Sequence, residues 1–236
     1  MKLPISCAQC MQEDVANTRI LTAVEFRDDG RYEITCPEGH VSTTILQQQK
    51  FEVLFEIGAY AIVDGYYREA VSSFTSALER FYEFFIKVMC ISNKSDWEET
   101  LKTWKEISNQ SERQLGAFIF LYHLEFGEKP TLLKNSLVNF RNGVVHKGKI
   151  PSKEEAINYG QEILNVLRPI IRTLKTQHDE SVQMATFRHL SSARTQDDNG
   201  RAVSTLEIGT ILSLSIADPS HEQKTLDAAL NKLRTW

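Results

Sequence analysis

The sequence predicts a mainly α protein, in which a helical bundle follows a small β module and precedes a β-hairpin plus helix extension. Three observations support this prediction. Apolar residues recur at helical spacing from about residue 46 to residue 178. Residues 1–45 contain short alternating runs and two cysteine-bearing turns, and residues 179–236 contain a strictly alternating run. We therefore expect three parts, with bounds at 1–45, 46–178 and 179–236.

The composition is that of an ordinary globular protein. The chain has 236 residues, of which 42% are hydrophobic and 25% charged, so it is long enough to bury a sizeable core. No apolar run approaches the roughly 18 residues of a membrane span, and the first ten residues lack the apolar stretch of a secretory signal. Four cysteines in such a chain favour a reducing compartment and metal binding over disulfides. We expect a cytoplasmic protein with no membrane association.

The first part of the chain has the pattern of a small β module. Strand-like residues are found around Ile20 to Phe26 and from Tyr32 to Thr35, and Asp28-Asp29-Gly30 stands between them. An Asp-Gly turn between two alternating runs is a hairpin signal. We expect the two runs to pair with each other.

Two pairs of metal-ligand residues lie on either side of these strands. Cys7 and Cys10 form a C-x-x-C turn, and Cys36 and His40 follow after 25 residues, in a turn that contains a proline and a glycine. A tetrahedral zinc ion needs four sulfur or nitrogen donors. The arrangement resembles a zinc ribbon, although that pattern normally has a second C-x-x-C where this chain has His40. We predict a structural zinc ion on these four residues; a redox C-x-x-C or an incidental turn are the alternatives.

Six amphipathic helices are predicted in the middle part, several of them opened by a capping box. They span Gln47 to Val63, Tyr67 to Ile91, a helix opened by Ser95-Asp96-Trp97-Glu98, Ser111 to about Phe126, about Thr131 to Val145, and a helix from the Ser152 cap toward Lys175.

The last part is expected to form a hairpin and a closing helix. Val182 to Leu190 is a weak strand candidate, and Asp198-Asn199-Gly200 is a turn. Leu206 to Ile216 alternates strictly between apolar and small or polar residues, which is strand spacing, and Thr225 to Leu233 has a helical pattern.

The most distinctive stretch contains no acidic residue from Lys129 to Lys153. Its six lysines and arginines give it a charge of +6 in a chain whose net charge is −4, so the remainder carries −10. A positive island in an acidic protein favours phosphate binding. It holds Arg141 and His146, and Lys147 and Lys149 are candidate substrate contacts, although exposed lysines are as plausible there.

His146 lies five positions after Arg141, or roughly 140° around an uninterrupted helix. They would not share a narrow face, but a wide cleft, most easily one shared by two copies of the chain, would collect both. Structural roles are the alternative: a histidine near a helix end commonly caps it, and Arg141 would then pair with an acid of a neighbouring helix. Glu79 is a candidate for that acid, and a solvated position on the helix surface is its equal alternative.

The segment Arg141-Asn142-x-x-x-His146 resembles the R-x4-6-H motif, with a polar residue after the arginine, of HEPN (higher eukaryotes and prokaryotes nucleotide-binding) domains. The following Lys147-Gly148 and Pro151-Ser152, and the upstream helix from Tyr67, are similar to the surroundings of that motif, and the likeness covers about residues 50–175. It implies a HEPN-like helical bundle that dimerises with its motifs facing across a cleft. Many members are metal-independent endoribonucleases, often toxins or defence effectors; others bind nucleotides or are inert scaffolds.

The side chains suit cleavage of RNA, which carries its own nucleophile in the 2′-OH. A histidine with a pKa of about 6.5 can remove that proton or protonate the leaving 5′-oxygen. Arg141 would hold the non-bridging oxygens, and Asn142 would orient His146 or the phosphate. We expect a metal-independent endoribonuclease, acting as a homodimer in a toxin or antiviral (abortive-infection) system, with an antitoxin or defence complex as a further partner. The alternative is a non-catalytic adaptor that binds nucleic acid or protein; no P-loop supports an NTPase.

Overall fold

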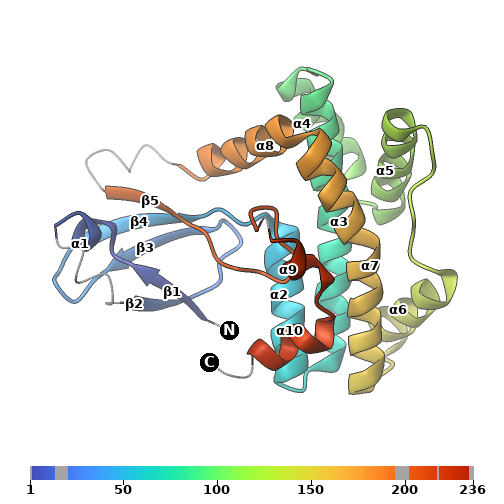
Figure 1. Ribbon diagram of the computed structural model, residues 1–236, viewed down its shortest axis with the longest axis horizontal. Helices are drawn as coiled ribbons and strands as arrows, with labels where there is room; N and C mark the ends of the chain where they lie inside the picture. The colour runs from blue at the N-terminus through green and yellow to red at the C-terminus, as the bar shows by residue number, and fades with distance from the viewer. Residues whose placement is uncertain (1, 14–20, 195–201, 217, 234–236) are drawn as a thin grey trace. The chain divides into compact units, whose positions relative to one another are not determined.

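A computed structural model describes residues 2–13, 21–194, 202–216 and 218–233 (Figure 1). The chain forms two compact units. The β unit comprises Met1–Gln48 and Thr186–Ile208, and the helical unit comprises Gln49–Ala185 and Gly209–Trp236. The C-terminal residues from 179 onward, expected as a part of their own, therefore contribute to both units.

The β unit contains one short helix and two sheets. Its elements are β1 (Lys2–Ser6), α1 (Ala8–Glu13), β2 (Leu21–Glu25), β3 (Arg31–Thr35), β4 (Val41–Leu46) and β5 (Ala202–Leu206). β1 and β2 form an antiparallel pair, and the second sheet has the order β3-β4-β5, with β3 antiparallel and β5 parallel to β4. β4, the middle strand, is buried from Ser42 to Leu46, which is why its sequence lacks alternation.

The expected pairing of the two runs that flank Asp28-Asp29-Gly30 is wrong, although the turn itself is present. Gly30 has a φ of 62°, and the Asp29 carboxylate accepts a hydrogen bond of 3.1 Å from the backbone N–H of Arg31. The strands on either side pair elsewhere, β2 with β1 and β3 with β4. Turn chemistry is local, whereas strand partners are decided by which apolar faces can be buried together.

The C-terminal region also differs from expectation. Val182 to Leu190 lies inside α8 (Asp179–Ser192), not in a strand. Of the alternating run only Leu206 belongs to a strand, since β5 ends there and pairs with β4 rather than with a hairpin neighbour. Residues 207–216 are irregular, and the expected turn at Asp198-Asn199-Gly200 lies outside the described residues.

Two buried glutamates explain why the segment after β5 is not a strand. The Glu56 carboxylate accepts a 2.9 Å hydrogen bond from the backbone N–H of Ile211, and Glu52 accepts one of 2.9 Å from that of Leu214. Side chains of one helix thus satisfy backbone groups that a neighbouring strand would otherwise bond. The alternating residues after Leu206 therefore belong to an irregular segment that Glu52 and Glu56 hold in place, and not to a strand.

The helical unit makes the chain mainly helical, as predicted. Its helices are α2 (Lys50–Val63), α3 (Tyr67–Ser92), α4 (Trp97–Ile107), α5 (Ser111–Phe126), α6 (Asn135–Lys147), α7 (Lys153–Gln177), the first half of α8, α9 (Pro219–Gln223) and α10 (Leu226–Leu233). The expected Ser152 cap of α7 is confirmed, because its hydroxyl accepts from the backbone N–H of Glu155. For α4 the cap is Asp96 rather than Ser95.

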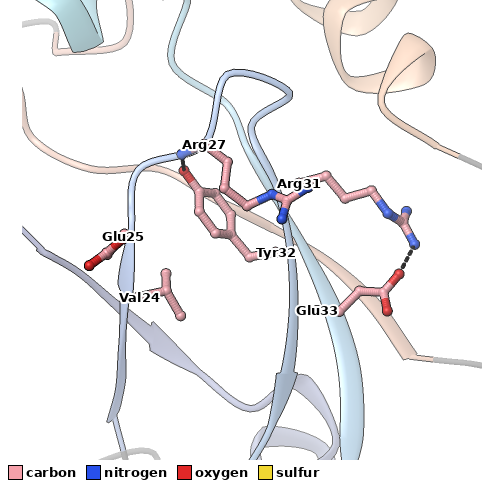
Figure 2. Close-up of a pocket in the computed structure, with 6 residues that line it drawn as sticks. All are labelled: Val24, Glu25, Arg27, Arg31, Tyr32 and Glu33. Carbon is pink, nitrogen blue, oxygen red and sulfur yellow. Dashed lines mark hydrogen bonds and ion pairs between the residues drawn. The ribbon is translucent and has the colours of Figure 1, made fainter.

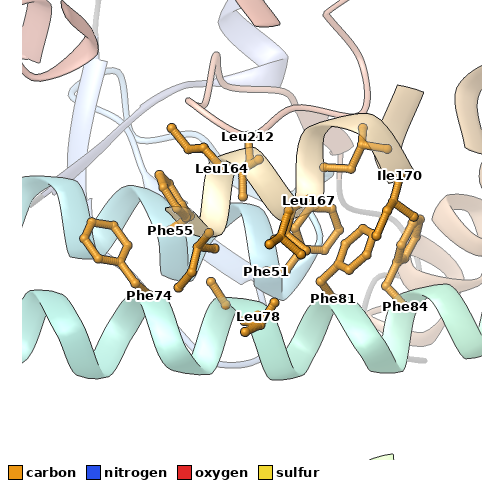
Figure 3. Packing of buried hydrophobic residues seen from close by; sticks show 14 of the residues in the cluster. Phe51, Phe55, Phe74, Leu78, Phe81, Phe84, Leu164, Leu167, Ile170 and Leu212 are labelled. Atoms are coloured by element: carbon orange, nitrogen blue, oxygen red, sulfur yellow. The ribbon is translucent and has the colours of Figure 1, made fainter. Parts of the chain in front are cut away.

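The core of this unit lies between α2, α3 and α7 (Figure 3). Phenylalanines from α2 and α3 fill it, and the rings of Phe55 and Phe74 lie 4.6 Å apart. Two glycines let the helices approach: a Cβ on Gly58 or on Gly160 would lie 2.7 Å from the Phe74 ring. Such a core holds α3 rigidly, and α3 supplies one wall of the cavity described next.

Candidate functional site

The four residues predicted as metal ligands come together in the β unit. Their ligand atoms all lie within 4.8 Å of one another. Cys7 precedes α1, Cys10 lies within it, and Cys36 and His40 flank the turn between β3 and β4. The three cysteines are buried and His40 is half-buried. The segments that carry the two pairs are therefore folded against each other.

The local geometry fits a zinc ion. The Cys10 and Cys36 sulfurs lie 3.7 Å apart, close to the edge of about 3.8 Å expected for two thiolates on one tetrahedral Zn²⁺. The Cys10 sulfur lies 3.3 Å from Nδ1 of His40. The second turn is closed by a 2.9 Å hydrogen bond from the N–H of Gly39 to the carbonyl of Cys36, with Gly39 at a φ of 82° that favours glycine.

The electrostatics of the cluster also favour a cation. Burial and the neighbouring Cys36 and Cys7 thiols raise the pKa of Cys10 to about 12. Burial also raises the pKa of Cys7, but hydrogen bonds from the backbone of Cys10 and from the Ser42 hydroxyl outweigh it and lower the value to about 7. Crowded thiols thus resist losing more than one proton, which a bound divalent cation reverses. Nε2 of His40 faces Glu13 at 3.5 Å, leaving Nδ1 as its ligand atom.

A second hollow of the β unit lies between β2 and β3 and has a volume of about 660 Å³ (Figure 2). Most of its polar side chains are already paired. Arg27 binds Asp29 at 2.7 Å and Arg31 binds Glu33 at 3.0 Å. The Tyr32 hydroxyl accepts a hydrogen bond from the backbone N–H of Arg27. We assign this hollow no role, because its two arginines and two glutamates balance in charge and both arginines are already paired.

Arg141 and His146 line one open cavity of about 380 Å³ in the helical unit. The lining residues come from α3, from the α4–α5 turn with the start of α5, and from α6; they are Ser72, Thr75, Ser76, Glu79, Arg80, Ser108, Asn109, Ser111, Gln114, Arg141, Val145 and His146. α6 is regular from Asn135 to Lys147, so the backbone is not distorted to bring the pair together. The cavity is instead wide enough for Arg141, Val145 and His146 all to line it.

Arg141 is held from two sides. Its Nη1 donates a 3.0 Å hydrogen bond to the Asn142 side-chain oxygen, and its Nη2 lies 3.8 Å from Glu79. The Glu79–Arg141 pair, which was one of the alternatives for Glu79, is therefore present. Burial raises the pKa of Glu79, an effect that the Arg141 and Arg80 charges oppose in part. Within this chain, Asn142 therefore orients the Arg141 guanidinium, whereas the sequence suggested that it would orient His146 or the phosphate.

The end of α6 places the remaining predicted residues. His146 and Lys147 are exposed in the last turn, and Gly148 ends the helix with a φ of 72°. Lys149 is engaged: its Nζ lies 2.6 Å from a Glu155 oxygen and 4.7 Å from the centre of the Phe140 ring. It joins the end of α6 to the start of α7, so its role as a substrate contact stays a prediction.

Hydrogen bonds join three lining residues that the sequence did not single out, namely Arg80, Ser108 and Gln114. Gln114 is 2% exposed; its amide donates a 2.6 Å hydrogen bond to the carbonyl of Ser108 and accepts one of 2.9 Å from Arg80. Arg80 also binds Glu83 at 2.6 Å. Arg80 and Gln114 lie 34 positions apart in the sequence, and Gln114 in turn holds Ser108, so the network joins α3 to the α4–α5 turn. No local sequence pattern indicates it.

Comparison of the chain with protein-family models, with curated proteins and with solved structures finds no match. Within the part of the chain that the structure describes, no helix is both long and apolar enough to cross a bilayer. The geometry of the two sites is therefore the basis for any functional assignment.

Proposed function

We propose that this protein is a HEPN-type endoribonuclease that cleaves RNA without a catalytic metal, acting as a homodimer. The observation that carries the proposal is that Arg141 and His146 line the same open, polar cavity. Glu79, from a different helix, lies against Arg141 there. A guanidinium, an exposed imidazole and several hydroxyls around a space of about 380 Å³ suit a ribose-phosphate group.

The chemistry assigns one role to each side chain. Arg141 binds the non-bridging phosphate oxygens, which take the place of Glu79 at the guanidinium. The guanidinium then stabilises the additional negative charge that these oxygens carry in the transition state. His146 removes the 2′-OH proton as the 2′-oxygen attacks the adjacent phosphorus. The bond from phosphorus to the 5′-oxygen breaks, leaving a 2′,3′-cyclic phosphate. The departing 5′-oxygen needs a proton, which His146 of a second copy supplies in the dimer.

An apolar stripe on α5 supports the homodimer. Phe120 and Leu124 lie one helical turn apart, and they are 71% and 76% exposed. Two large apolar side chains at that spacing form a face that a second copy would cover. Covering this stripe with a second copy would give an assembly that contains two cavities and two copies of His146.

We assign the metal cluster a structural role. Zinc bound to Cys7, Cys10, Cys36 and His40 would hold the β unit together and take no part in the cleavage. Because all four cysteines, including Cys90, are free thiols, a reducing compartment such as the cytoplasm suits the protein. A ribonuclease there needs restraint, so we place it in a toxin or antiviral system with an antitoxin or defence-complex partner.

Cleavage of labelled single-stranded RNA tests the proposal. Wild type should cut the RNA and leave DNA of the same sequence intact, because DNA lacks the 2′-OH. His146→Ala should reduce the rate about 10²- to 10⁴-fold, the usual contribution of a general acid–base. His123→Ala is the matched control, an exposed histidine on α5 that does not line the cavity. A folded wild type that leaves all RNAs intact, or unchanged cleavage by His146→Ala, contradicts the assignment.

A non-catalytic adaptor is the second candidate, and the internal pairing of Arg141 and Lys149 favours it. A protein of this kind would bind RNA through the charge of the basic stretch and release no product. His146→Ala would then keep the full affinity, whereas reversing the charges of Lys147 and Lys149 would weaken it in a salt-dependent way.

A further inference from the structure

The α4–α5 turn contributes one wall of the cavity that holds Arg141 and His146. Ser108 and Asn109 belong to the turn, and Ser111 begins α5. These residues lie about 30 positions from the α6 motif, and the chemistry of cleavage does not use them. Their placement beside the reacting groups gives them access to whatever part of the substrate adjoins the phosphate.

The backbone of this turn is fixed. The buried Gln114 amide holds the carbonyl of Ser108, and Nη1 of Arg113 donates a 3.0 Å hydrogen bond to the carbonyl of Glu106. Within the turn, the N–H of Ser108 donates to Trp104 at 2.9 Å and the N–H of Gln110 to Ile107 at 3.2 Å. A side chain mounted on such a backbone keeps its position when a ligand arrives, which is what selective recognition requires.

Asn109 has the functional groups for contacting a base. It is exposed, and its amide offers one acceptor and two donors side by side, as the edges of nucleobases do. None of the described residues that line the cavity is a phenylalanine, tyrosine or tryptophan. His146 and Arg141 are engaged with the phosphodiester in the proposed reaction, so hydrogen bonding rather than stacking recognises the base there. A volume of about 380 Å³ is near the lower end for ligand pockets, which suits one nucleotide.

We propose that Asn109 contacts the base of the nucleotide whose phosphate Arg141 holds, so that the protein selects the base beside the cut. The inference rests on the proposed ribonuclease function and names its substrate class. That substrate is single-stranded RNA, because an unpaired base is needed to present its hydrogen-bonding edge to Asn109.

Two measurements on Asn109→Ala test the inference, with Gln110→Ala as the matched control. Gln110 carries the same amide on the next residue, is exposed and does not line the cavity. The first measurement is the cut-site profile on a pool of single-stranded RNAs with all four bases at every position. Asn109→Ala should reduce the base preference about two- to tenfold, the loss of one net hydrogen bond, and Gln110→Ala should keep it.

The second measurement does not depend on cleavage. Binding of the four ribonucleoside 3′-monophosphates is followed by NMR titration of the backbone amides. Wild type should rank the four bases, and Asn109→Ala should flatten the ranking while the weak binding through phosphate persists.

The outcomes separate the two proposals. If wild type cuts no RNA but ranks the mononucleotides through Asn109, the ribonuclease assignment fails and base recognition stands. If Asn109→Ala changes neither the cut-site profile nor the ranking, or if wild type shows no base preference in either experiment, the inference is overturned. Amide spectra of both variants that match wild type exclude misfolding as the cause.

Discussion

The two units hold their candidate sites in opposite ways. In the β unit the ligand residues are themselves a large part of the interior, since Cys7, Cys10 and Cys36 are buried between short strands. In the helical unit Arg141 is half-buried and His146 is exposed, and neither residue belongs to the phenylalanine-rich core. We therefore expect a metal bound at the first site to contribute to folding, whereas the second site depends on a core that is already folded.

Metal removal should show this difference most strongly. Chelation, or Cys36→Ser, should unfold the β unit, because structural zinc sites contribute binding energy on the order of 10 kcal/mol to folding. The helical unit should keep its helices. Hydrogen exchange of individual amides measures both units in one experiment, and metal content by mass spectrometry gives the stoichiometry. Equal loss of amide protection in both units, or loss in neither, would contradict the expected difference between them.

The helical unit should respond to pH instead of metal, through Glu56. Burial raises the pKa of its carboxyl from 4.5 to about 7. Below pH 4.5 both folded and unfolded chains hold the proton; as the pH rises toward 7 the unfolded chain releases it first, so stability falls across that window. A shift of this size corresponds to roughly 2–4 kcal/mol. Above pH 7 the loss is complete.

Glu56→Gln should remove this pH dependence. The amide oxygen can still accept the hydrogen bond from the N–H of Ile211, and no charge is buried. Urea denaturation of wild type and variant at pH 5 and pH 8 measures the difference. Equal pH slopes in the two proteins would show that Glu56 is not responsible.

A close approach between helices gives a smaller effect in the same unit. A Cβ on Gly160 of α7 would lie 2.6 Å from Leu226 and 2.7 Å from Phe74. Gly160→Ala should therefore destabilise the helical unit by about 1–3 kcal/mol through overpacking. Gly116→Ala is the control, because a Cβ there meets nothing within 4 Å and alanine favours the helix by up to about 1 kcal/mol. Opposite signs in urea denaturation are the expected result.

Prediction from the sequence succeeded where the signal was local. The six central helices were predicted because their apolar residues recur every three to four residues over long spans, and Ser152 caps α7 as its motif indicates. The bounds were less exact, since α6 begins at Asn135 rather than at about Thr131. The grouping of Cys7, Cys10, Cys36 and His40 was predicted because two short turns each carry a pair of donors that suit a metal ion. Opposite charges on two predicted helices made Glu79 a possible partner of Arg141, and the structure decided for that pairing over a solvated Glu79.

Prediction failed where distant segments decide the outcome. The parallel pairing of β5 with β4 joins residues 160 positions apart, such as Ser42 and Ala202, and no local pattern marks such a partner. The irregular segment after β5 depends on Glu52 and Glu56, which lie far earlier in the chain. Gln114 was missed for the same reason, since its partners Arg80 and Ser108 belong to other elements.

The amino-acid sequence by itself determined the helical class, the donors of the metal cluster and the Arg141/His146 pair, because each depends on residue types at short, regular spacing. Only the tertiary structure decided which strands pair, how the C-terminal residues divide between the two units, and that five-residue spacing on α6 opens into one cavity with α3 and the α4–α5 turn. The physical reason is burial: which apolar faces exclude water together is a property of the whole chain, and short segments do not contain it.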